Sequence, residues 1–219
     1  SIVLLDKDLR VVAEGVRLGR RTFVNTMKYV RVGVSAAFGN VVSMAIADVF
    51  LPFLPLLPMQ ILLLNFMTDF PALAISGDSV DSENVISPRA WDIKSIRKFM
   101  ILFGLLSSLF DIFTFVVLRL GFGASAILFR SGWFVESTLT ELTVMMVLRT
   151  NRRFWCSRPG KGLFWSSAIL AVLTVALPFT PLGTVIGLMA LPLPLLLILF
   201  GLIGVYAAMN ELAKKYWWR

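Results

Sequence analysis

The stretch LLLNFMTDFPALAI carries polar side chains inside an otherwise apolar run. Asn65, Thr68 and Asp69 stand three and four positions apart, so a helix places their oxygens on one face. Pro71 has no N–H to donate to the carbonyl of Met67, which leaves a backbone oxygen beside them. Several hard oxygens with one negative charge suit Mg²⁺ or Ca²⁺. The pattern indicates an intramembrane cation site, and its alternative is a polar patch that joins helices.

The composition is that of an integral membrane protein. Of 219 residues, 58% are hydrophobic, and the mean hydropathy is +0.83; a soluble domain has about 45–50% apolar residues. There is no His and only one Cys, Cys156, which argues against His/Cys metal sites, disulfides and Ser-His or Cys-His catalysis. The net charge of +8 comes from residues at the predicted helix ends, so it does not indicate a nucleic-acid partner.

The apolar segments predict an all-α integral membrane protein with six transmembrane helices. Residues 1–27 precede them and are expected to form a short strand followed by an amphipathic helix that continues into the membrane. Residues 28–219 form the predicted membrane domain. Each span is near the ~20 residues that a bilayer core requires. The predicted spans are 30–51, 56–76, 98–120, 133–149, 163–180 and 190–212.

The basic residues predict the orientation of these spans. One side has seven Lys and Arg in residues 1–31, four in 89–98, five in 149–161 and three in 214–219, which makes 19 of the 21. The opposite side has only Arg119 and Arg130. The positive-inside rule therefore predicts a multi-pass protein of the cell membrane with both termini in the cytoplasm.

Two further polar residues within the spans are candidates for the cation site, and each has a structural alternative. Asn40 lies in the middle of the first span, where it either supplies an oxygen or forms an interhelical hydrogen bond that the neighbouring Gly39 assists. Glu141 lies deep in the fourth span, where a carboxylate requires a partner or an ion.

Three other acids are expected to have different roles. Asp48 lies near the outer end of the first span, where it is hydrated at an entrance. Asp111 lies deep in the third span, where a partner such as Arg119 or a neighbouring hydroxyl is as good an explanation as transport. Glu136 is predicted near the outer end of the fourth span, with a structural role or a role at the rim of the site.

Two segments resemble parts of the P-type ATPases. SIVLLDKDLRVVAEGVRLGRRTFVNTMKYV resembles the end of their phosphorylation domain and the start of the fifth transmembrane helix. FGNVVSMAIADVFLPFLPLLPMQILLLNFMTDFPALAI resembles the fifth and sixth transmembrane helices, with the signature Asn-x-x-Thr-Asp-x-x-Pro. FGNV, FDIFTF and SGWFVES resemble the bacterial magnesium-transporting members. The resemblance covers essentially the whole chain, although its later helices match mainly in order, length and topology.

The resemblance implies roles for particular residues. Asn40 falls where calcium pumps have a Glu ligand, whereas Ala37 falls where many members have an Asn, so that this ligand is absent here. Glu141 lies at the position of a Gln or Glu that borders the site in the eighth helix. The implied cation ligands are Asn40, Asn65, Thr68, Asp69 and Glu141.

The function implied is that of the membrane part of an ATP-driven cation pump, with Mg²⁺ as the transported ion. Such a pump also has a phosphorylated Asp in Asp-Lys-Thr-Gly-Thr and a nucleotide domain, and neither is in this sequence. This chain alone is therefore not expected to hydrolyse ATP or to bind a cofactor. Its expected partners are the lipid bilayer, a divalent cation and the remaining ATPase domains in cis, and its first residue, Ser, suggests a fragment.

Three other functions are compatible with the sequence. The chain could be a non-catalytic scaffold or accessory remnant of such a pump, since the amide at position 37 is lost. It could belong to a Ca²⁺ pump of the same superfamily. A stand-alone channel or carrier is the third alternative, although no inverted repeat of the kind common in carriers is evident.

Overall fold

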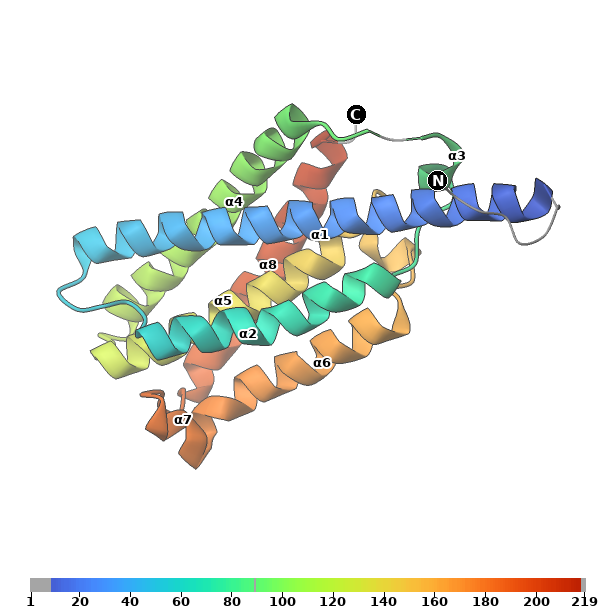
Figure 1. Ribbon diagram of the computed structural model, residues 1–219. Coiled ribbons are helices and arrows are strands. Elements are labelled where there is room, and N and C mark those ends of the chain that lie inside the picture. Colours follow the sequence, from blue (N-terminus) through green and yellow to red (C-terminus); the bar gives the residue numbers. More distant parts are fainter. Residues whose placement is uncertain (1–8, 89, 218–219) are drawn as a thin grey trace.

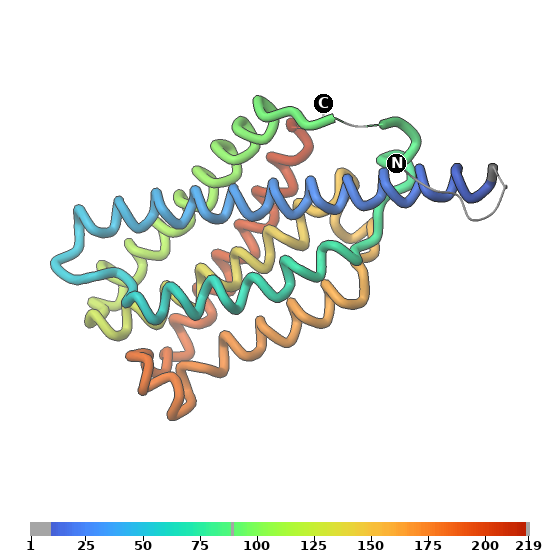
Figure 2. The backbone as a smooth tube through the Cα atoms, viewed as in Figure 1, coloured from blue at the N-terminus to red at the C-terminus, as the bar shows by residue number. Residues whose placement is uncertain are grey.

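The computed structural model describes residues 9–88 and 90–217, and this part of the chain is helical without a β-strand. The predicted strand at the start of the chain falls on residues 1–8, outside the described residues. The long helices form a bundle and are connected alternately at its opposite ends (Figures 1 and 2). They are α1 (Leu9–Phe50), α2 (Pro58–Ala74), α4 (Ile93–Val116), α5 (Ala126–Leu148), α6 (Lys161–Ala176) and α8 (Leu193–Trp217).

Short helical segments lie between the long ones. The 3₁₀ turn η1 (Ile75–Gly77) extends α2, and the π-helical turn η2 (Val117–Gly121) extends α4. The others are α3 (Glu83–Ile86), η3 (Phe154–Cys156), η4 (Leu177–Phe179) and α7 (Pro181–Val185).

The ends of several helices follow from local chemistry. Pro58 opens α2, where its missing N–H is not needed, and Gln60 accepts a hydrogen bond from the Leu57 amide at 2.9 Å. Asp92 caps α4 by accepting from the amides of Lys94 and Ser95. These caps satisfy amides that have no partner inside the helix.

Five helical segments in the described part of the chain are long and apolar enough to cross a membrane. They contain α1, α2, α4, α6 and α8. Helix α5 is about 34 Å long but is not one of these five segments; it contains Glu136 and Glu141. It is also the most enclosed helix, since every residue from Ser131 to Thr140 is buried. The polar groups of α5 therefore face protein.

Helix α1 is one continuous helix of 42 residues. At 1.5 Å per residue it is about 63 Å long, roughly twice the thickness of a hydrocarbon core. It projects beyond the other helices at the end of the bundle where α3 lies (Figure 1). This agrees with the prediction of a helix that starts outside the apolar region and continues through it.

Helices α1 and α4 approach closely where each has a glycine. A Cβ atom added to Gly39 would lie 3.1 Å from the carbonyl oxygen of Gly104, and one added to Gly104 would lie 2.6 Å from a ring carbon of Phe38. The glycines therefore allow the two backbones to approach closely, as is common between membrane helices.

Candidate cation site

A cavity of about 320 Å³ lies between α1, α2 and α5. Its wall also includes Tyr29, Ala37 and Met145. All five residues that the sequence predicts as cation ligands line this one cavity. They are Asn40 on α1, Asn65, Thr68 and Asp69 on α2, and Glu141 on α5.

Helix α2 contributes three oxygen-bearing side chains at the predicted spacing. The Thr68 hydroxyl, only 2% exposed, donates to the carbonyls of Leu64 and Asn65 at 3.2 Å each. Its single hydrogen is thus used within the helix, and the oxygen is left as an acceptor. Asn65 and Asp69 are exposed, so the cavity is open on the side formed by α1 and α2.

Glu141 on α5 lines the same cavity as the three polar residues of α2. It lines the cavity together with Thr68 and Asn40, and its Oε2 is buried without a hydrogen-bond partner among the described residues. The Asn40 amide oxygen also accepts a bond from the Ser137 hydroxyl at 3.5 Å. Three helices therefore direct oxygens toward one volume.

In the described part of the chain, the wall of the cavity contains acidic side chains and no basic one. Asp69 and Glu141 supply two carboxyl groups, and no salt bridge joins either of them to a Lys or Arg in residues 9–88 or 90–217. The described residues contain no group of three or more His, Cys, Asp or Glu side chains that could hold a metal ion. Neutral amide and hydroxyl oxygens complete the set, as is common for hard cations.

A family model described as cation transporting ATPase, C-terminus, matches residues 53–216. The chain belongs to this family. It is 40% identical, over its full length, to the Magnesium-transporting ATPase, P-type 1, of Escherichia coli (strain K12) and to that of Salmonella typhimurium (strain 14028s / SGSC 2262). A shorter match, 31% identical over 38% of the chain and 9% of the relative, is to the Calcium-transporting ATPase of Bacillus subtilis (strain 168).

These matches confirm the family resemblance predicted from the motifs. The chain spans 25% of the length of the magnesium-transporting relatives. It therefore corresponds to a C-terminal, multi-pass membrane region of a larger type of ATPase.

The other predicted acids of this ATPase region lie outside the cavity. Asp111 accepts from the Ser43 hydroxyl at 2.5 Å and from the Trp133 indole at 2.8 Å, so a hydroxyl and not Arg119 is its partner. Glu136 is in the middle of α5 and 1% exposed, not near the outer end of a span as predicted. Asp48 is exposed near the end of α1.

A second polar cluster is centred on Asp78, just after η1, and was not predicted from the sequence. Its buried carboxylate accepts from Lys28 of α1 at 2.7 Å, from Arg149 at the end of α5 at 3.4 Å, and from the amide of Gly160 at 2.8 Å. Asn25 of α1 also donates to the Asp78 carbonyl at 3.0 Å. The cluster connects the N-terminal half of α1 to the α2–α4 and α5–α6 connections.

Opposite charge was the signal that could have revealed this cluster. The connection after α2 is acidic and the connection after α5 is basic. The two connections are in contact: Thr150 donates to Asp81 at 2.6 Å, and Arg152 forms a salt bridge with Glu83 at 2.5 Å.

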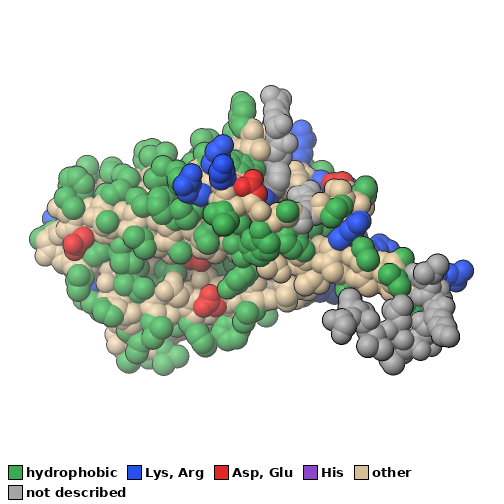
Figure 3. Space-filling view, turned by 45° about the horizontal axis from the view of Figure 1, so that its top comes forward, with side chains coloured by type: hydrophobic (Ala, Val, Ile, Leu, Met, Phe, Trp, Pro, Cys, Tyr) green, Lys and Arg blue, Asp and Glu red, His purple; other side chains and the backbone are tan. Residues whose placement is uncertain are grey.

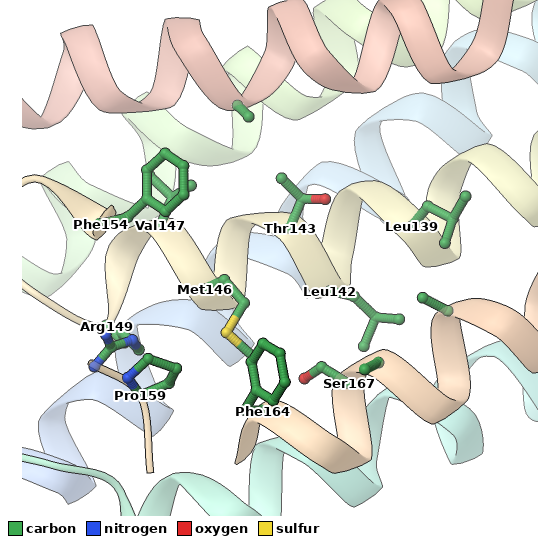
Figure 4. Close-up of a pocket in the computed structure, with 13 residues that line it drawn as sticks. Leu139, Leu142, Thr143, Met146, Val147, Arg149, Phe154, Pro159, Phe164 and Ser167 are labelled. Carbon is green, nitrogen blue, oxygen red and sulfur yellow. The ribbon is translucent and has the colours of Figure 1, made fainter. Parts of the chain in front are cut away.

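A larger hollow of about 400 Å³ lies between α5, α6 and α8 (Figure 4). Its wall is mostly apolar, with Leu142, Met146 and Phe164 around it and Arg149 toward one end. It offers few oxygens to a cation, so size alone does not identify the functional site of this ATPase region.

Proposed function

We propose that this chain is the membrane part of an ATP-driven P-type pump that transports Mg²⁺. The observation that carries the proposal is the convergence of Asn40, Asn65, Thr68, Asp69 and Glu141 on one cavity. The printed names of the full-length matches, which are magnesium-transporting ATPases, support the choice of ion.

The dimensions of the cavity favour a partly hydrated ion. A water molecule takes about 30 Å³ in the liquid, so a cavity of about 320 Å³ has room for an ion and several waters. Mg²⁺ gives up its waters reluctantly, whereas Ca²⁺ takes six to eight oxygens directly. The loss of an amide at Ala37 leaves fewer protein ligands, which suits an ion that keeps part of its hydration shell.

The proposed membrane topology has six spans, with α5 as the span that the others enclose. Residues 28–219 would form this domain, and residues 1–27 would be the end of a cytosolic phosphorylation domain. On the visible face, Lys and Arg side chains gather over one half of the molecule and the remainder is largely hydrophobic (Figure 3). We assign the basic end to the cytoplasm, which places both termini there.

The proposed coupling runs through α1. Phosphorylation of a domain elsewhere in the polypeptide would tilt the projecting part of α1, and the rigid helix would carry Asn40 with it. Lys28 of α1 donates a hydrogen bond to Asp78, which lies just beyond the end of α2. Movement of α1 would therefore also shift α2, the helix that carries Asp69. The cavity would thereby open to alternate sides of the membrane.

The test measures ATP-dependent Mg²⁺ uptake into lipid vesicles that contain the complete protein. The wild type is compared with an Asp69→Asn variant. The variant should lose ATP-dependent uptake, because it removes one of the two carboxylates. Asp48→Asn is the matched control, since Asp48 is exposed and outside the cavity. Uptake by Asp69→Asn with unchanged Mg²⁺ affinity would refute the site.

The same vesicles separate the rival functions. Mg²⁺ flux without ATP would indicate a channel or carrier, and no flux under any condition would indicate a scaffold. ATP-dependent uptake of Ca²⁺ in preference to Mg²⁺ would indicate a calcium pump.

A further inference from the structure

Two acids that do not line the cation cavity face each other in the interior of the bundle. Asp111 on α4 is 2% exposed, and Glu136 on α5 is 1% exposed. Trp133 on α5 donates to Asp111 at 2.8 Å and lies three residues, about one helical turn, before Glu136, so the two carboxyl groups interact across the α4–α5 contact. The proposed transport mechanism uses neither of them, so their pairing requires its own explanation.

The surroundings of Asp111 are those of a carboxylate. Both of its oxygens accept hydrogen bonds, Oδ2 from Ser43 of α1 at 2.5 Å and Oδ1 from the indole N–H of Trp133 at 2.8 Å. Such donors stabilise the charged form of an acid. Asp111 is therefore the member of the pair that is equipped to carry a negative charge.

Glu136 lacks comparable support. Its Oε2 is fully buried and has no hydrogen-bond partner in the described part of the chain. No salt bridge connects Glu136 or Asp111 to a basic residue within that part. A second charge here would be buried, unpaired and adjacent to a like charge, which is a very unfavourable arrangement.

The conflict is removed if the pair carries only one negative charge, because Asp111 keeps its two donors, Ser43 and Trp133, in that state. A proton fits, because one O–H group on Glu136 can donate to the Asp111 carboxylate. We propose that Asp111 and Glu136 form a proton-binding site that holds one proton between α4 and α5, with Glu136 as the group that carries it.

The proton-binding pair lies where α1, α4 and α5 meet. Through Ser43 the pair is connected to α1, and Ser43 lies three residues, one helical turn, from Asn40. Loss of the proton leaves two carboxylates in contact, whose repulsion would separate α5 from α4 and α1. The other ionisable groups that interact electrostatically with the pair are Tyr206 on α8, with both acids, and Glu141 on α5, with Asp111.

Infrared spectroscopy of the complete, lipid-reconstituted protein tests the site directly. A neutral carboxylic acid has a carbonyl stretching band separate from those of carboxylates and amides, and the band shifts in D₂O. The wild-type protein should show this band at neutral pH, and Glu136→Gln should lose the part of its intensity that Glu136 contributes. The Gln side chain has the same shape and can donate to Asp111, so the variant is expected to fold.

Glu141→Gln is the control, because it removes the other buried glutamate of α5 and should leave the Glu136 band in place. A second measurement leaves Glu136 unchanged and uses glutamate labelled with ¹³C in its side-chain carboxyl group. The label should shift the band in the Glu141→Gln protein. A band of unchanged intensity in Glu136→Gln, a band in Glu141→Gln that does not respond to the label, or no neutral-acid band at all would overturn the proposal.

Discussion

Lys28 on α1 donates a hydrogen bond of 2.7 Å to Asp78, which follows the end of α2 and is completely buried. Arg149 from the end of α5 reaches the same carboxylate at 3.4 Å and is itself 3% exposed. One acid thus holds together the basic groups of two helices that also line the cation cavity. The relative positions of α1, α2 and α5 depend on this carboxylate.

Replacing Asp78 by Asn should destabilise the protein strongly. The substitution keeps the shape of the side chain but leaves the charges of Lys28 and Arg149 buried without a counter-charge, which costs about 3–5 kcal/mol. Thermal unfolding of the purified protein in detergent measures the effect. A melting temperature equal to that of the wild type would show that Asp78 does not organise this end of the bundle.

Glu83→Gln is the matched control, because it removes the same charge from an exposed salt bridge. Arg152 donates to both oxygens of Glu83 at 2.8 and 2.5 Å, and this hydrogen bonding lowers the pKa of Glu83 from its ordinary value of 4.5. The small stabilisation is therefore present above about pH 4.5 and is lost as the pH falls through the lowered pKa. The stability difference between wild type and Glu83→Gln should shrink on acidification, and a difference independent of pH would contradict this.

The α2 part of the candidate site is predictable from the sequence, but its other members are not predictable from spacing alone. Asn65, Thr68 and Asp69 share a face because helical geometry requires it. Asn40 and Glu141 come from other helices, and no periodicity within α2 brings them to Thr68. Their assignment to the cavity needed the family resemblance, because it depends on how the helices pack.

The helix of the fourth predicted span begins seven residues earlier than the predicted start at residue 133. Residues 121–132 contain three glycines, Ser125 and Arg130 and were interpreted as the connection between two spans, so the fourth span was predicted to begin at residue 133. The helix begins at Ala126, where Ser125 accepts from the amide of Leu128, and Arg130 is accommodated by donating to the Leu54 carbonyl at 3.0 Å. The shift moves Glu136 from a predicted rim to the interior.

Replacing Glu141 by Gln should weaken the binding of Mg²⁺ without unfolding the protein. The amide keeps a hydrogen-bonding group near Thr68 and Asn40 but removes one of the two carboxylates of the cavity. We expect a loss of at least about tenfold in Mg²⁺ affinity, since altering even outer groups of a metal site costs 10–100-fold. The Mg²⁺ concentration dependence of ATP-driven uptake provides the measurement, and an unchanged dependence would remove Glu141 from the ligand set.

The contact between α1 and α4 gives the last prediction, Gly104→Ala. The added methyl group would lie 2.6 Å from a ring carbon of Phe38 and 3.0 Å from the carbonyl oxygen of Ser35, which is too close for either. Overpacking of this kind costs about 1–3 kcal/mol, so the variant should unfold at a lower temperature. Gly201→Ala on α8 is the control, because a Cβ there meets nothing within 4 Å and alanine favours a helix by about 1 kcal/mol relative to glycine. If Gly104→Ala is as stable as Gly201→Ala, α1 and α4 do not pack backbone to backbone at this point.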